Sequence, residues 1–252
     1  MKIIKDIFYS AVKDEAHKLD LWLPDGECQA LLLFFHGGGL DSGSRNIDFM
    51  PGFAEDMTNT GFGIASAEYR MYPSAKYPDF IEDAAEAVAF ARRELTKAVG
   101  TEKLIVGGTS AGGYLSQMLC FDARWLGKHG IKPNDIDGFI HDAGQPTVHF
   151  SVLKERGVDW RSVIVDESAP MYHVGEAQSY PPMQIIVSDR DIENRPEQTE
   201  LLVSTMRHFG YDMSRVCLTK TSGTHTWYIT RADENGNNEF AKLIIPFIKK
   251  HI

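Results

Sequence analysis

A serine flanked by glycines is the feature that most constrains the fold of this 252-residue chain. The segment Gly108-Thr109-Ser110-Ala111-Gly112 follows an apolar run at 104–106 and precedes a helix-like stretch at 114–121. Glycines on both sides of a serine allow the backbone to turn sharply from a strand into a helix. The pattern predicts Ser110 at the apex of that turn, close to a helix N-terminus that favours negative charge. The alternative is an ordinary strand-to-helix loop with a capping serine.

A second glycine motif follows another apolar run. His36-Gly37-Gly38-Gly39 comes directly after residues 30–35, which are wholly apolar. A serine that attacks a carbonyl group creates an oxyanion, which needs backbone N–H donors already in place. Successive glycines allow the main chain to approach a substrate closely and to aim its N–H groups inward. Either motif alone is weak, but together, each at the end of a predicted strand, they indicate a nucleophilic serine.

The remaining chain alternates between strand and helix patterns. Strands are predicted at 3–10, 18–23, 30–35, 63–67, 103–106, 137–141, 183–187 and 215–219, and helices at 47–60, 78–99, 195–209 and 238–250. This alternation predicts an α/β fold with a mostly parallel sheet covered by helices on both faces. Ligands bind beyond the carboxyl ends of such strands, where both glycine motifs lie. Without internal repeats or a linker, residues 1–252 are predicted to form a single domain.

Net charge, cysteine content and apolar stretches restrict the kinds of partner and the cellular compartment that we expect. The net charge of −9 argues against nucleic-acid binding. Cys28, Cys120 and Cys217 are far apart and odd in number, which is typical of reduced thiols. Residues 1–20 lack an apolar signal core and no stretch is long enough to cross a bilayer, so we expect a cytoplasmic protein without membrane association. The histidines show no paired ligand pattern, so neither a metal nor an organic cofactor is expected. The sequence leaves the oligomeric state open.

A serine hydroxyl needs a base to take its proton, and a carboxylate usually orients that base. Among nine histidines, His225 lies on the predicted loop between the last strand and the final helix, at the same edge as Ser110. The carboxylate should follow the strand at 183–187, where Asp189 and Asp191 both stand. We favour Asp191, because the loop must extend past the strand to reach a histidine on the next one. Asp189 remains the alternative.

With these residues in this order, the chain resembles α/β-hydrolases of the esterase and lipase group related to hormone-sensitive lipase. The resemblance covers most of the chain after residue 35 and includes the order Ser110, Asp191, His225. It also includes both glycine motifs and the segments Glu68-Tyr69-Arg70-Met71-Tyr72-Pro73, Tyr77-Pro78 and Asp83, which support the site in similar proteins. The resemblance implies an oxyanion hole formed by the N–H groups of Gly37, Gly38 and Ala111.

One departure from the family concerns the cover of the site. Only about 35 residues precede the glycine motif, and two early strands take up much of them, so no large N-terminal cap is expected. A short insert at 142–180 is the predicted cover, although its residues could equally be ordinary surface. Gln145 in this insert and Trp227 after His225 are the predicted substrate contacts. The alternative for Trp227 is a place in the core.

The predicted function is a serine carboxylesterase that hydrolyses short-chain acyl esters through an acyl-enzyme. Acetylated sugars or other plant-derived esters are suggested by family resemblance alone. The partner would then be a small-molecule ester. An amidase or peptidase, such as an arylformamidase, would use the same groups. The least favoured hypothesis is a ligand-binding module that has kept a hydrolase scaffold without catalysis.

Overall fold

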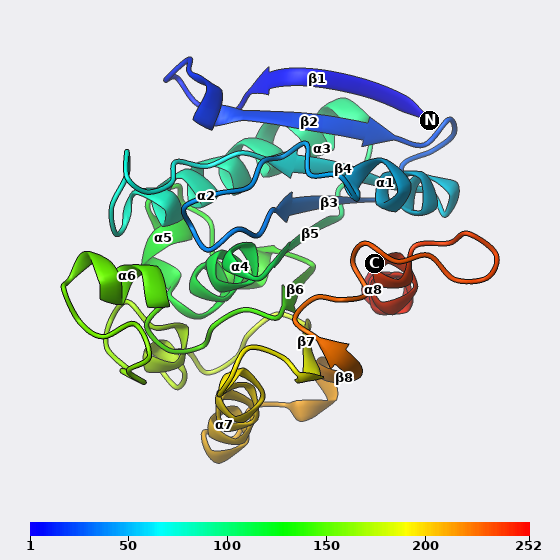
Figure 1. The fold of residues 1–252 in the computed structure, drawn as a ribbon. Coiled ribbons are helices and arrows are strands. Elements are labelled where there is room, and N and C mark those ends of the chain that lie inside the picture. The colour runs from blue at the N-terminus through cyan, green and yellow to red at the C-terminus, as the bar shows by residue number, and fades with distance from the viewer.

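One eight-stranded sheet forms the centre of the computed structural model, which describes residues 1–252. The spatial order of the strands is β1-β2-β4-β3-β5-β6-β7-β8, with β1 and β8 at the two edges (Figure 1). The first two strands pair antiparallel, and the other six run parallel. The strands are β1 (Lys2–Phe8), β2 (Lys18–Leu23), β3 (Ala30–Phe35), β4 (Phe62–Ala67), β5 (Leu104–Thr109), β6 (Gly138–Asp142), β7 (Met183–Arg190) and β8 (Val216–Thr224). The predicted fold class is therefore confirmed.

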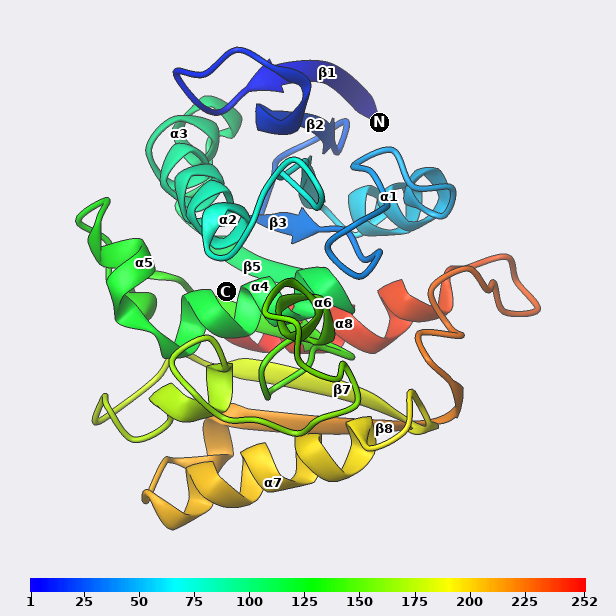
Figure 2. The ribbon, with the colours of Figure 1, turned by 60° about the vertical axis from the view of Figure 1, so that its left-hand side comes forward.

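Helices cover both faces of this sheet. On one face α1 and α8 pack over a core of 21 buried residues, and on the other α2, α4 and α7 pack over a core of 46 (Figure 2). The central strands are buried on both faces, which explains why β3 is wholly apolar and why β4 and β5 contain no charged residue. The helices are α1 (Met50–Asn59), α2 (Asp79–Phe90), α3 (Thr96–Val99), α4 (Ala111–Phe121), α5 (Ala123–Gly127), α6 (Phe150–Glu155), α7 (Arg195–His208) and α8 (Glu239–His251).

Several elements differ from the prediction in length or continuity. The helix expected at 78–99 is one continuous run of helical turns, but a π-helical segment, Ala91–Leu95, separates α2 from α3. The short helices α5 and α6 were not predicted, because neither has a full apolar period. Strands β7 and β8 extend beyond their apolar runs to residues 190 and 224. Their extension brings the residues after them to the same edge of the sheet as the turn after β5.

No helix in the structure combines the length and apolar character needed to span a bilayer.

Candidate active site

The turn after β5 holds Ser110 in a strained conformation. Its φ of 54° and ψ of −110° lie outside the regions that a serine ordinarily adopts. The surrounding backbone is packed too closely for side chains: a Cβ at Gly108 would lie 2.5 Å from the backbone of Gly112. A Cβ at Gly112 would lie 2.0 Å from the carbonyl oxygen of Phe35, at the end of β3. Close contact between strand and helix therefore explains both glycines, and the turn places the Ser110 hydroxyl at the N-terminus of α4.

Three side chains from separate loops form a hydrogen-bonded series at this edge. His225 directly follows β8, and its Nε2 lies 2.9 Å from the Oγ of Ser110. Its Nδ1 lies 2.5 Å from Oδ1 of Asp191, which directly follows β7. The Asp191 side chain is fully buried, whereas that of His225 is 24% exposed. The structure thus brings the three predicted residues together, with the imidazole between the hydroxyl and the carboxylate.

Asp189, the alternative carboxylate, faces a different group. Its Oδ1 accepts a hydrogen bond from the backbone N–H of Gly223 at 2.8 Å, and Oδ2 accepts one from the Ser222 hydroxyl at 2.9 Å. These two bonds, the first above all, lower the pKa of Asp189. The pairing of β7 with β8 is irregular between Ser188 and Arg190, at the position of Asp189, whereas Asp191 follows the end of β7. Asp189 therefore holds the end of β8, next to His225, rather than contacting the imidazole.

The glycine loop after β3 lies against the serine turn. A Cβ at Gly37 would be 3.2 Å from the Cβ of Ser110, so the two backbones are in close contact. Gly38 and Gly39 have φ values of 117° and 66°, in the left-handed region that favours glycine. Ala111 is the first residue of α4. The two segments predicted to hold an oxyanion therefore both adjoin Ser110.

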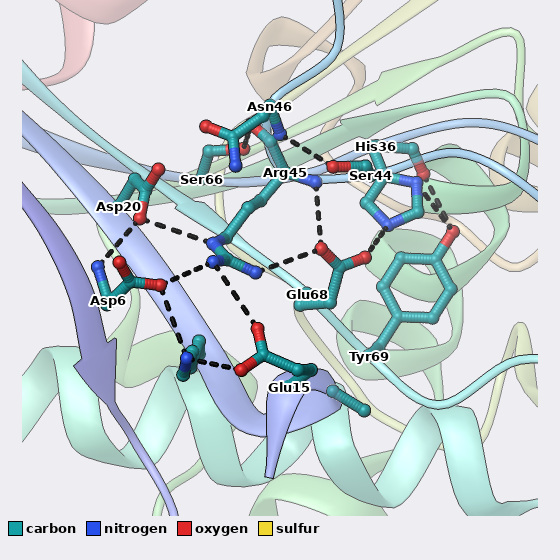
Figure 3. Close-up of polar contacts among 12 residues, drawn as sticks. Asp6, Glu15, Asp20, His36, Ser44, Arg45, Asn46, Ser66, Glu68 and Tyr69 are labelled. Carbon is teal, nitrogen blue, oxygen red and sulfur yellow. Dashed lines mark hydrogen bonds and ion pairs between the residues drawn. The ribbon is translucent and has the colours of Figure 1, made fainter.

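A polar network around His36, Glu68 and Arg45 holds this glycine loop in place (Figure 3). His36 contacts the Gly37 carbonyl oxygen through Nδ1 at 2.7 Å and Oε1 of Glu68 through Nε2 at 2.9 Å. The Tyr69 hydroxyl donates to the His36 carbonyl oxygen at 2.9 Å. Burial alone would raise the pKa of Glu68, but its bonds to His36 and Arg45 hold that pKa below its ordinary value. The network fixes the loop's first residue by its ring and by its backbone.

Arg45 is the centre of the network and connects it to the edge of the sheet. Its guanidinium contacts Oε2 of Glu68 at 3.3 Å, Oδ1 of Asp20 at 3.2 Å and Oδ1 of Asp6 at 2.7 Å (Figure 3). Asp6 lies in the edge strand β1 and Asp20 in β2. A fourth carboxylate, Glu15, lies 4.0 Å away (Figure 3). Arg45 is only 7% exposed, so these carboxylates compensate a charge that is largely removed from water. Arg45 was not singled out from the sequence.

Asp142, the last residue of β6, joins the serine turn to the histidine loop. Its carbonyl oxygen accepts a hydrogen bond from the backbone N–H of Ser110 at 2.8 Å. Its carboxylate accepts bonds from the Thr109 hydroxyl at 2.6 Å and from the hydroxyl of Tyr228, three residues after His225. Complete burial raises the pKa of Asp142 to about 6. From the sequence, only the position of Asp142 at the carboxyl end of a buried strand could have indicated that it supports the site.

A cavity of about 420 Å³ is lined by residues of the segment 145–162, of the loop after Asp191 and of α7. Phe150 in its wall would touch a Cβ at Gly39 at 3.2 Å, and Ile192 in its wall directly follows Asp191. The cavity therefore lies near the glycine loop and the loop of the triad carboxylate, while Ser110, Asp191 and His225 are not among its lining residues. The lining includes Gln145, Phe150, Trp160, Ile192, Arg195 and Gln198.

The two residues predicted to contact substrate take different positions. Gln145 lines the cavity. Trp227 does not; its ring packs onto Gly223 and Tyr228 and against the core under α1 and α8. The structure thus favours the alternative weighed for Trp227, a packing role. No group of three or more His, Cys, Asp or Glu side chains is arranged to hold a metal ion.

Comparison with known proteins shows which proteins this chain is similar to. The BD-FAE family model matches residues 19–125. Esterase LipC of Mycobacterium tuberculosis is 27% identical over 219 residues, which are 77% of this chain and 53% of the relative. The chain thus spans about half the length of this curated relative, and less of the others that it matches.

Two solved structures share the fold over nearly the whole chain. A truncated carbohydrate esterase from gut microbiota superposes with a TM-score of 0.78 at 17% identity, over 100% of this chain and 96% of that one. Thermogutta terrifontis esterase 2 phosphonylated by sarin superposes with a TM-score of 0.77 at 22% identity, over 97% and 94%. The predicted resemblance to esterases and lipases of the α/β-hydrolase fold is confirmed.

Proposed function

We propose that this chain of α/β-hydrolase fold is a serine carboxylesterase that cleaves esters of short carboxylic acids. The observation that carries the proposal is the continuous hydrogen-bonded series from the Ser110 hydroxyl through His225 to Asp191. An imidazole that contacts a hydroxyl on one side and a buried carboxylate on the other can accept a proton and be stabilised as a cation. The names of similar proteins, esterase and lipase, agree with this chemistry.

In the first half of the reaction Ser110 attacks the ester carbonyl carbon while Nε2 of His225 takes the hydroxyl proton. Negative charge then develops on the carbonyl oxygen. The backbone N–H groups of Gly37, Gly38 and Ala111 are the proposed donors to this oxygen, and the N-terminus of α4 adds its dipole. Collapse of the tetrahedral intermediate breaks the ester bond, and His225 protonates the departing alcohol.

The second half repeats these steps with water as the nucleophile. His225 removes a proton from water, which attacks the acyl-enzyme carbonyl, and the proton returns to Ser110 as the acid leaves. Asp191 keeps the imidazole in the required orientation throughout, because its bond to Nδ1 leaves Nε2 facing the serine. Asp142 contributes by holding the serine turn and the histidine loop at a fixed separation.

The proposed substrate site is the cavity between the glycine loop and the Asp191 loop. Residues 142–180 contribute Gln145, Phe150 and Trp160 to its wall, which supports a covering role for this segment. A volume of about 420 Å³ fits an acyl group together with a ring-sized alcohol. Because one structural neighbour is a carbohydrate esterase, acetylated sugars are a class worth testing.

The test is hydrolysis of 4-nitrophenyl acetate, butyrate and octanoate by the wild type and by Ser110→Ala. We expect turnover to fall by at least about three powers of ten in Ser110→Ala, with the native fold retained by circular dichroism. Ser204→Ala, an exposed serine on α7, is the matched control. A fluorophosphonate should label the wild type and the control but not Ser110→Ala. Turnover that survives in Ser110→Ala would disprove the mechanism, and faster cleavage of formyl or dipeptide amides than of esters would indicate an amidase.

A further inference from the structure

The wall of the proposed substrate cavity contains a buried cation that forms no salt bridge. Arg195, the first residue of α7, is 4% exposed and lines the cavity. Its NH1 donates to the carbonyl oxygen of Ala143, and its NH2 donates to Oε1 of Gln145 at 3.2 Å. Both acceptors are uncharged. Its Nε makes no hydrogen bond within the chain. The guanidinium has five N–H donors, so some of them can still donate hydrogen bonds to a ligand.

Comparison with Arg45 shows that this arrangement is unusual within the same molecule. These two are the chain's buried arginines, and Arg45 contacts Asp6, Asp20 and Glu68. Arg195 has no carboxylate oxygen within 4.0 Å, although its charge is equally removed from water. Burial lowers the pKa of Arg195 to about 10, so it stays protonated at neutral pH. The Asp191 carboxylate favours the charge from beyond 4.0 Å, but the effect of burial is larger. A bound anion would offset the remaining cost of this buried charge.

The walls around Arg195 suit a flat ring rather than a small ion. Phe150 and Trp160 face the cavity, and Nζ of Lys154 lies 5.2 Å and 5.9 Å from their ring centroids. This cation adds positive potential to the same wall. Of the other charged lining residues, Arg161 is paired with Asp159, and Glu193 is exposed to solvent.

We propose that this cavity selects esters whose alcohol part is a ring that carries a carboxylate. The guanidinium of Arg195 donates to the carboxylate, while the ring packs against Phe150 and Trp160. Ser110 attacks the ester carbonyl at the opposite end of the substrate. The proposal rests on the proposed function, since it names the substrate class of that same site. The carboxylate could be borne by an aromatic acid or by a sugar acid, which share the chemistry that Arg195 recognises.

Matched ester pairs test the proposal by kinetics. The anionic members are 4-acetoxybenzoate, 4-acetoxyphenylacetate and an acetylated glucuronate, and the neutral members are the corresponding primary amides. We expect the wild type to prefer at least one anionic member in kcat/KM. In Arg195→Gln the ratio of anionic to neutral kcat/KM should fall about ten- to hundredfold, which is the worth of a charge-assisted hydrogen bond. Whether an aromatic or a sugar carboxylate shows the larger ratio distinguishes the two sources.

Controls separate recognition from a merely structural role. Arg207→Gln removes the same charge from the exposed far end of α7, and we expect the wild-type ratio. Arg195→Lys keeps the charge and should restore part of the preference. If Arg195→Gln lowers anionic and neutral turnover equally, Arg195 only holds the Ala143 carbonyl and the Gln145 side chain in place, and the proposal is wrong. An absence of carboxylate preference in the wild type would overturn it as well.

A binding measurement keeps the inference distinct from the proposed function. Titration of 4-hydroxybenzoate and 4-hydroxybenzamide into the wild type needs no turnover. Tighter binding of the carboxylate, reduced about tenfold or more in Arg195→Gln, supports the subsite even if no ester is hydrolysed. Equal binding of the two compounds by the wild type counts against the subsite, even if neutral esters are hydrolysed through Ser110.

Discussion

Replacement of Asp142 by asparagine should change how the stability of the protein depends on pH. The Asp142 carboxyl is fully buried beneath the serine turn and accepts hydrogen bonds from Thr109 and Tyr228. Burial raises its pKa from the ordinary value of 3.8 to about 6. Between these two values the folded protein holds a proton that the unfolded chain has released. The stability due to this proton is therefore lost as pH rises from about 4 to 6.

The size of the effect follows from the shift. Each unit of pKa corresponds to about 1.4 kcal/mol, so a shift of about two units costs about 3 kcal/mol once the carboxyl is fully ionised. Between pH 4.5 and pH 7 about 2 kcal/mol of this loss should occur, because titration in the unfolded chain has already begun at pH 4.5. The asparagine of Asp142→Asn has no proton to lose and keeps an amide that can contact both hydroxyls.

Urea denaturation followed by tryptophan fluorescence at pH values from 4.5 to 7.5 measures this difference. From pH 4.5 to 7 the free energy of unfolding of the wild type should fall by about 2 kcal/mol relative to that of Asp142→Asn. Asp189→Asn serves as the control of opposite sign, because the pKa of the exposed Asp189 is lowered in the folded state. Parallel stability curves for the wild type and Asp142→Asn would refute the reasoning.

Three further predictions concern the site and its supports. Asp191→Asn should lower kcat for 4-nitrophenyl acetate by about three to four powers of ten, because the imidazole loses its charged partner. Asp189→Asn should lower kcat less than about tenfold. Similar losses of kcat in both variants would contradict the assignment of Asp191. Glu68→Gln weakens the buried contacts of Glu68 with His36 and Arg45 and should destabilise the fold by about 1–3 kcal/mol in urea denaturation. In the same variant, kcat should fall by a larger factor than the factor by which KM changes. Gly112→Ala places a Cβ 2.0 Å from a backbone oxygen of β3 and should lower the free energy of unfolding by at least about 1–3 kcal/mol. In Gly127→Ala the new Cβ has no atom within 4 Å, so the free energy of unfolding should hardly change.

Local patterns were sufficient to predict the framework of the sheet. The bounds of β2 and β3 agree with the predicted ranges. For β3 the reason is that a strand buried on both faces has little choice of residues, so the strand is wholly apolar. Chain order was sufficient to predict which loops meet, since the carboxyl ends of parallel strands share one edge. That is why Ser110 and His225, which are 115 residues apart, could be expected to lie together.

Polar contacts between distant segments could not be predicted in the same way. The bond between Tyr228 and Asp142 joins residues 86 positions apart, and neither belongs to a motif. Arg45 finds its carboxylates on β1, on β2 and directly after β4, which no spacing rule connects. Asp189 and Asp191 stand two residues apart where the pairing of β7 with β8 is irregular, and the sequence does not reveal which of them faces His225. Such details arise only when the sheet has assembled.

The bond from Arg45 to Asp6 makes the glycine loop dependent on the most peripheral part of the sheet. Strand β1 pairs with a single neighbour, and most of its residues are exposed to solvent. Edge segments of this kind open at lower free-energy cost than the rest of a domain. When β1 frays on heating, Arg45 loses one counter-ion and the support of His36 loosens while the central strands are still intact. Heat inactivation would then precede the calorimetric melting of the sheet, and strengthening β1 would raise the temperature at which activity is lost.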